Sequence, residues 1–347
     1  MWVKSLLAFP DKDFDIRKGS YMCQASEKGD VGILVELLAA GADTNEKSLN
    51  CEKRPLHICA EYGHLDALAT LLNYGADIDQ LDAHKRTAMH FASQQGHDSL
   101  IQWLIDHGAH ADQIEMDGYS PLHVASCLGY EKVCKSLLTI GKAEVNLLSN
   151  DSWSSLHMAV SYGHLEIVKM LLSFGAYHSK KTAEGETALH MASAKGFTDM
   201  VQVLLDHGTH VESCNNHEAT PMHYAVFYGH IKVVYCLLKA GASINFLHLP
   251  AISCPVNLSA MRGDQDMMDL LRCAGCVVRK DTAFLLHLRK NISAQYRDEI
   301  SRFPSLRDLC IWKIRLVLAP DLQRKTRLLP LPEVLKDIIV LSHLKIS

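Results

Sequence analysis

The feature that most constrains this chain is a pair of glycines that recurs every 33 or 34 residues. One glycine of each pair ends a Leu-rich segment and stands at 41, 75, 108, 141, 175, 208, 241 or 275. The other stands at 29, 63, 96, 129, 163, 196, 229 or 263. Two glycines per period indicate two helix ends, because glycine adopts the left-handed conformation that closes a helix. A fixed period of this length predicts a repeat architecture.

Each period carries the local signals of two short helices. Segments such as Ser120-Pro121-Leu122-His123 and Thr220-Pro221-Met222-His223 place Ser or Thr at the helix start and Pro in the first turn. The second helix, for example residues 165–172, has apolar residues at three- and four-residue spacing, a stripe that must be buried against neighbours. Polar stretches between the periods predict turns or fingers.

These residues resemble the ankyrin repeat, whose signature is a period of about 33 residues with a Thr-Pro-Leu-His-x-Ala start. The resemblance covers residues 17–278 and implies an all-α ankyrin solenoid of about eight repeats. The first and last units depart from the signature, as terminal units of a solenoid usually do.

A different pattern begins after residue 278. Pro304 and Ser305 are helix-start signals, and Leu306, Cys310 and Ile314 follow at four-residue spacing on one helix face. Leu329-Pro330-Leu331-Pro332 comes next, followed by an apolar helical run. A stripe of this kind is stabilised by burial in a partner's groove, or by packing on the end of the repeat array.

The two C-terminal elements resemble the SOCS box, so the chain is similar to members of the ankyrin repeat and SOCS box family. The resemblance implies an adaptor that joins elongin C, elongin B, cullin-5 and its RING partner to a protein substrate for ubiquitination. Leu306, Cys310 and Ile314 would bind elongin C, and Leu329, Pro330, Leu331 and Pro332 would contact the cullin. Ile338 stands where many members have tyrosine, a departure within the cullin-selecting element.

These patterns predict four regions. They are an N-terminal segment (1–16), the ankyrin array (17–278), a helical linker or cap (279–303) and a small helical SOCS box (304–347). The net charge of the chain is −4, but fourteen basic and seven acidic residues follow residue 278. The basic residues are scattered without interleaved aromatic side chains, so we expect a solvated surface and no binding of nucleic acid or membranes.

The chain has no recognisable catalytic or cofactor motif. Its repeat histidines, His57, His90, His123, His157, His190 and His223, are one repeat apart, so we expect neutral imidazoles that bond loop backbone groups, not metal ligands. Cys273 and Cys276 form a single Cys-x-x-Cys with no second pair. We therefore expect a non-enzymatic protein without metal or cofactor. Eleven cysteines without framework spacing favour a cytosolic or nuclear location with reduced thiols.

A protein partner would bind the finger loops and inner helices, as the ankyrin resemblance implies. Aromatic residues concentrate at the positions expected there, and the candidate substrate-binding residues are Tyr119, Trp153, Tyr162, Phe227 and Tyr228. The alternative is that the tyrosines before the inter-helix glycines pack over the adjacent turn. An ankyrin scaffold without any ligase role is the alternative function.

Overall fold

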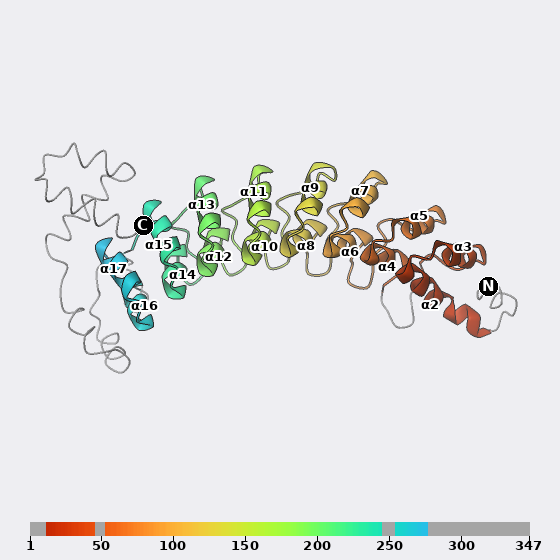
Figure 1. The fold of residues 1–347 in the computed structure, drawn as a ribbon, viewed down its shortest axis with the longest axis horizontal. Coiled ribbons are helices and arrows are strands. Elements are labelled where there is room, and N and C mark those ends of the chain that lie inside the picture. The colour runs from red at the N-terminus through yellow and green to blue at the C-terminus, as the bar shows by residue number, and fades with distance from the viewer. Residues whose placement is uncertain (1–11, 46–52, 245–253, 277–347) are drawn as a thin grey trace, which may run out of the picture. The chain divides into compact units, whose positions relative to one another are not determined.

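The computed structural model describes residues 12–45, 53–244 and 254–276, and these form helices without any strand (Figure 1). The chain divides into two compact units, Met1–Ala183 and Glu184–Ser347. The helices of the first unit are α2 Lys12–Lys28, α3 Val31–Ala39, α4 Pro55–Tyr62, α5 Leu65–Asn73, α6 Ala88–Gln95, α7 Asp98–Asp106, α8 Pro121–Leu128, α9 Glu131–Thr139, α10 Ser155–Tyr162 and α11 Leu165–Ser173. Those of the second are α12 Ala188–Lys195, α13 Thr198–Asp206, α14 Pro221–Tyr228, α15 Ile231–Lys239, α16 Pro255–Arg262 and α17 Gln265–Cys273.

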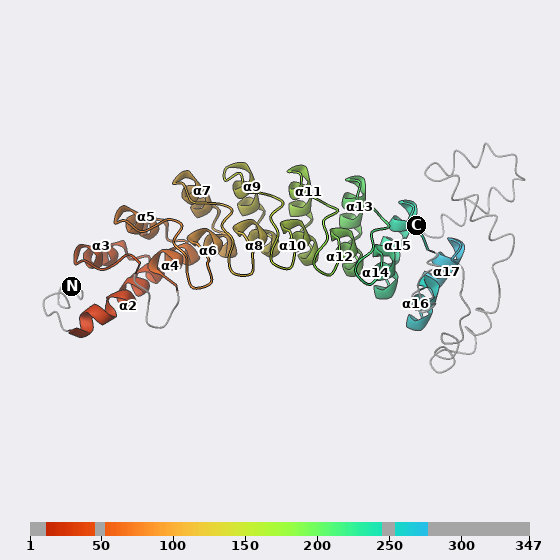
Figure 2. The same cartoon turned by 180° about the vertical axis from the view of Figure 1, so that it is seen from behind.

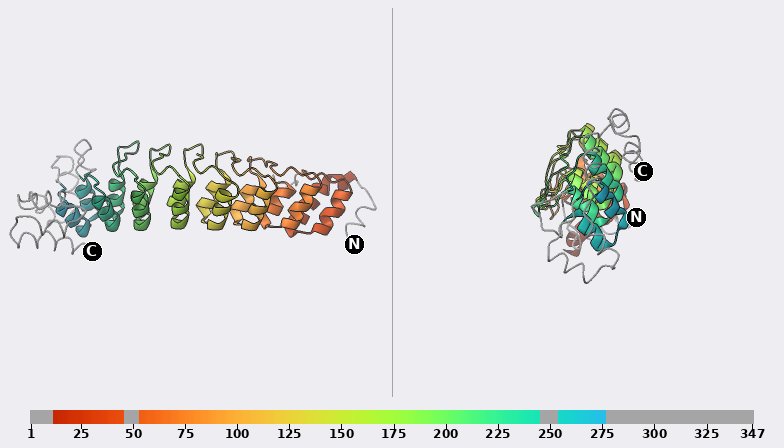
Figure 3. Two further views of the ribbon diagram at one scale, coloured as in Figure 1. Left: turned by 90° about the horizontal axis from the view of Figure 1, so that it is seen from above. Right: turned by 90° about the vertical axis from the view of Figure 1, so that its left-hand side faces the viewer.

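The helices of the first unit form antiparallel pairs stacked in two rows (Figures 1 and 2). The even-numbered helices α2, α4, α6, α8 and α10 make the inner row, where each packs on the next, and the odd-numbered helices make the outer row. The loops that join successive pairs lie along one side of the helices (Figure 3). We call residues 77–86, 110–119 and 144–153 of this unit its finger loops. In the second unit, α14 packs between α12 and α16, and α13 packs on α15.

The core lies between the rows and between successive pairs. In α11, Ile167, Val168 and Leu171 are fully buried, which confirms the apolar stripe predicted for this helix. The inner helices α4, α6, α8 and α10 each begin after a residue in extended conformation and end at a left-handed glycine, for example Ser120 and Gly129 around α8. The short helices thus obtain their stability from packing, because isolated helices of this length are marginal.

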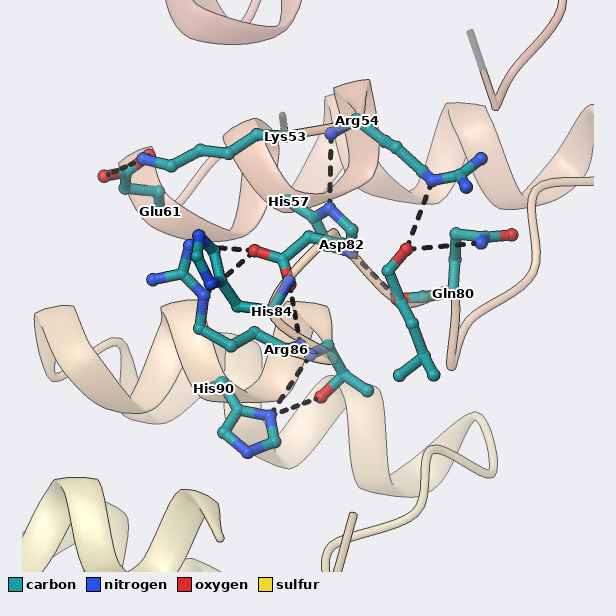
Figure 4. Close-up of polar contacts among 11 residues, drawn as sticks. Lys53, Arg54, His57, Glu61, Gln80, Asp82, His84, Arg86 and His90 are labelled. Carbon is teal, nitrogen blue, oxygen red and sulfur yellow. Dashed lines mark hydrogen bonds and ion pairs between the residues drawn. The ribbon is translucent and has the colours of Figure 1, made fainter. Parts of the chain in front are cut away.

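A buried histidine joins each of the helices α4, α6, α8, α10 and α12 to the following loop. At α6, the Thr87 N–H donates to His90 Nδ1 (3.2 Å), and His90 Nε2 lies 3.1 Å from the Tyr119 carbonyl (Figure 4 labels His90). Because Nδ1 accepts a backbone N–H, the ring proton is on Nε2 and the imidazole is neutral. The same bonds recur at His57, His123, His157 and His190, whose Nε2 atoms meet the carbonyls of Gln80, Trp153, Lys180 and Ala219. This confirms the neutral, loop-binding role predicted for five of the six repeat histidines. At His223 the structure shows the bond at the helix start, where the Thr220 N–H donates to Nδ1 (3.0 Å).

A second set of four histidines, which we did not predict, bonds a helix pair to the preceding one. His97 Nε2 lies 2.9 Å from the Glu61 carbonyl, and His164 Nε2 lies 2.9 Å from the Cys127 carbonyl. His64 and His230 make the same contact with Glu27 and Ala194. The signal was in the sequence, since each of these histidines directly follows an inter-helix glycine. These bonds satisfy carbonyls at the ends of inner helices, where no intrahelical donor exists.

Two of the glycines that follow helices, Gly129 after α8 and Gly108 after α7, provide a test of this stacking. Gly129 has φ +83°, and a Cβ there would lie 2.5 Å from the His164 ring, whereas Gly108 has φ +89° and open space around its Cβ position. Gly108→Ala should cost about 1–2 kcal/mol of unfolding free energy, the cost of a left-handed alanine. Gly129→Ala should cost about 1 kcal/mol more, because the ring must leave its carbonyl. Urea denaturation at neutral pH measures both; equal midpoints would contradict the packing role of His164.

Acid provides a second test. Burial lowers the pKa of His90, His123 and His157 to about 4, from the usual 6.5. The unfolded chain therefore binds more protons than the folded chain between pH 6.5 and 4, so the free energy of unfolding falls as the pH falls through this range. Each of these histidines should lower the free energy of unfolding by about 2 kcal/mol between pH 7 and pH 5. A urea midpoint that does not change from pH 7 to pH 5 would be inconsistent with buried neutral rings.

Candidate binding face

In the finger loops of the first unit, acidic side chains accept hydrogen bonds from backbone N–H groups of the same loop and thereby fix the loop conformation. In the first loop, an Asp82 carboxylate oxygen accepts the N–H groups of His84 (2.9 Å) and Arg86 (2.8 Å). In the second loop, Glu115 accepts from Asp117 and Tyr119 in the same way. Such local side-chain bonds stabilise turns, so the residue four places before each repeat histidine has a fixed position.

Aromatic residues occupy this position in two consecutive loops. Tyr119 and Trp153 are each half-buried, and each ring lies edge-on to the histidine that begins the next helix. The ring centroids are 5.8 Å apart for Tyr119 and His123, and 6.2 Å apart for Trp153 and His157. The remaining surface of both rings is open to solvent.

The last residue of each inner helix adds further apolar surface. Tyr162 is 61% exposed at the end of α10, and Leu128 is 45% exposed at the end of α8. The Cys127 thiol raises the pKa of Tyr162, through its charge and a hydrogen bond, with a smaller contribution from Tyr119. We call Tyr119, Leu128, Trp153 and Tyr162 the aromatic face.

The alternative, that these tyrosines pack over the adjacent turn, describes part of the geometry. The Tyr62 ring stacks on His64 (6.2 Å between centroids), and the Tyr228 ring stacks on His230 (6.4 Å). Both tyrosines nevertheless remain about half exposed. One side of each ring packs on the turn and the other is available to a partner.

The second unit carries its own aromatic cluster on α14. Phe227 and Tyr228 are exposed and contact each other edge-on at 5.0 Å. Tyr224, which we did not predict, stacks on Tyr228; its hydroxyl donates to Glu186 and accepts from Asn215 Nδ2 (3.0 Å). Burial and the bond to Glu186 raise the pKa of Tyr224. Its position after His223 is the only sequence signal for it, and in most repeats an apolar core residue stands there.

The inner row of the first unit is charged next to the aromatic face. Lys53 pairs with Glu61 (2.6 Å) and Arg86 pairs with Asp82 (2.8 Å) (Figure 4). Both cations also lie over the ring of Phe91, the Lys53 Nζ at 5.1 Å and the Arg86 guanidinium carbon at 4.6 Å from the centroid. The cations and their carboxylates therefore cover Phe91, which is 1% exposed.

The cysteines of the Cys-x-x-Cys are separated in environment. Cys276 is buried with its Sγ 3.8 Å from Cys254 Sγ, while Cys273 is exposed at the end of α17. Within the described ranges, no group of three or more His, Cys, Asp or Glu side chains could hold a metal ion. Nor does any helix within those ranges have the length and hydropathy needed to span a membrane.

The candidate elongin- and cullin-binding residues, Leu306, Cys310, Ile314 and Leu329 to Pro332, lie outside the described residues. So does the predicted linker at 279–303, while α2 begins at Lys12, before the boundary expected at residue 17.

Comparison with known families identifies the repeats. A family model described as ankyrin repeats (3 copies) matches residues 21–115, 108–182 and 156–247. No curated protein matches the chain. The family matches together span well over half of the sequence and coincide with the stacked helix pairs and finger loops. The chain therefore belongs to the ankyrin-repeat family.

Proposed function

We propose that this protein is a non-catalytic adaptor that holds a protein substrate on its ankyrin repeats and delivers it to an elongin B/C–cullin-5 RING ubiquitin ligase. The observation that carries the binding half is the aromatic face. Tyr119, Trp153 and Tyr162 are held in fixed loops or at helix ends, yet each leaves ring surface open to solvent. Aromatic side chains dominate the energetics of protein interfaces, and rigid ones lose little entropy on binding.

The ligase half rests on the C-terminal sequence. Leu306, Cys310 and Ile314 form the stripe that the SOCS-box resemblance assigns to elongin C, and the Leu-Pro-Leu-Pro at 329–332 follows in the expected order. A short amphipathic helix gains stability when a partner's groove buries its apolar stripe. Cullin-5 and its RING partner would complete the assembly.

Effective concentration supplies the mechanism. A substrate tethered on the repeats meets the ubiquitin-loaded enzyme in an intramolecular encounter, which replaces a rare bimolecular one. No reactive group of the adaptor is needed, and we assign no catalytic residue. A cytosolic or nuclear location follows from this proposal, since the ligase partners act there.

A scaffold that binds a partner and never meets a cullin is the second candidate. The binding face favours it equally, because that face requires only protein binding. The C-terminal motif pair is what separates the two functions.

Replacing Leu306 and Cys310 together by Asp should abolish co-purification with elongins B and C, because two charges cannot enter an apolar groove. Arg307→Ala, which lies outside the stripe, is the matched control and should retain both elongins. Affinity capture from cells with quantitative mass spectrometry measures the loss. Elongin capture that is absent from the unchanged chain, or that survives the double change, would support the scaffold.

Substrate capture should depend on the aromatic face. The double change Tyr119→Ala and Trp153→Ala should lower recovery of the substrate more than about tenfold, the effect expected for interface hot spots. Tyr74→Ala is the control, since Tyr74 is also about half exposed but follows the outer helix α5. Capture under proteasome inhibition, with a chain that ends at Arg302 run in parallel, reports substrates and ligase partners separately. Equal recovery from wild type and double variant would reject this site.

A further inference from the structure

On the inner side of the first unit, some aromatic rings are covered by cations of the protein itself and others are not. Around Phe91 the protein supplies its own cations, since Lys53 and Arg86 both lie over the ring. Both cations are the residues four places before a repeat histidine. Contact of this kind between a cation and an aromatic face is attractive, and more so where water is partly excluded.

The next two repeats place aromatic rings at that same position. Tyr119 and Trp153 replace the cations, and Val124 and Met158 take the place of Phe91 on the helices below. Within the part of the chain that the structure describes, no lysine or arginine lies over Tyr119, Trp153 or Tyr162. The aromatic face thus presents rings in the position where cations lie in the preceding repeats, but no described lysine or arginine covers them.

Carboxylates on the same two loops add a negative field. Asp117 and Asp151 are exposed, and Asp117 accepts the Asn150 N–H on its carbonyl at 2.9 Å, so the two loop tips lie side by side. Burial raises the pKa of the Tyr119 hydroxyl, a hydrogen bond with Ser149 lowers it, and the charges of Asp151, Asp117 and Glu115 raise it further. None of the three forms an ion pair with another described residue.

The charges of the neighbouring loops show how far this field extends. On the preceding loop, Lys85 and Arg86 are outnumbered by Asp77, Asp79 and Asp82, and Arg86 is paired with Asp82. The following segment of this unit carries Lys180 and Lys181. The negative charge therefore includes the two loops that present the aromatic rings and ends at this lysine pair. A partner that brings a positive charge to these loops is attracted there.

We propose that the aromatic face binds a lysine or arginine side chain from an exposed segment of the partner protein. Its aliphatic stem packs on the rings of Tyr119 and Trp153, and its charged end faces Asp117 and Asp151. Arginine fits best, because a planar guanidinium stacks on an aromatic ring and bonds carboxylates in the same plane. This inference rests on the binding half of the proposed function and is independent of the ligase half.

The test is selection of a random 12-residue peptide library displayed on phage against the purified full-length protein, with peptides that also bind Trp153→Ala removed. The selected peptides should be enriched in arginine and lysine. Their affinity, measured by fluorescence polarisation with synthetic copies, should fall more than about tenfold on Trp153→Ala. The affinity should fall about three- to tenfold on the double change Asp117→Asn and Asp151→Asn. This decrease should be smaller at 300 mM than at 50 mM salt, because salt screens the carboxylates.

Two controls keep the result specific. Asp106→Asn removes an exposed carboxylate at the end of the outer helix α7, and Tyr74→Ala removes an exposed ring, so neither should change the affinity. Far-ultraviolet circular dichroism and the urea midpoint confirm that each variant is folded.

The outcomes separate the two proposals. Selected peptides that need Trp153 but are rich in aspartate and glutamate, or carry no charge, would support the aromatic face as a binding site and contradict the proposal that it binds a lysine or arginine side chain. The absence of any Trp153-dependent peptide would overturn both the cation and the binding face. Elongin capture by the same preparation reports on the ligase half, whichever peptides are selected.

Discussion

The interaction on which this structure depends is the hydrogen-bond bridge from one short helix to the next loop through a buried neutral imidazole. The inner helices α4, α6, α8 and α10 have only about two turns each and could not persist alone. Histidines such as His90 and His123 satisfy the backbone at the helix start and fix the carbonyl of the following loop at the same time. Because both ring nitrogens bond backbone groups, each histidine holds its helix in register with the next loop. Protonation of the ring disrupts these bonds, so the fold is sensitive to acid.

The binding face follows from this bridge. The carbonyls that the histidines hold at α6 and α8 belong to Tyr119 and Trp153, the residues that we propose contact a partner. The backbone at these two positions is therefore held by hydrogen bonds to buried histidines, while the side chains are free to differ between repeats. This separation lets one loop carry Arg86 over Phe91 and the next carry an uncovered tyrosine. Specificity can vary along the array without a change in its packing.

Much of the fold could be predicted because its signals are local. The Ser-Pro start of α8, the glycine at its end and the stripe of α11 depend on residues within a few positions of each other. The solvent exposure of Tyr162 and Phe227 could be anticipated in the same way, from their place before the inter-helix glycine. Tyr224 was missed because its position is apolar in the other repeats, and its contacts with Glu186, Asn215 and Tyr228 come from residues that the local pattern does not connect.

The sequence by itself determined the repeat period, the helix starts and ends and the positions that reach the surface, because each is set by the conformational preferences of neighbouring residues. The tertiary structure decided which of those residues meet across repeats. The bond of His97 to the Glu61 carbonyl and the contact of Lys53 with the Phe91 ring join residues 36 and 38 positions apart. Such contacts depend on the rise and rotation from one pair to the next, and that step is a property of the packed side chains as a whole.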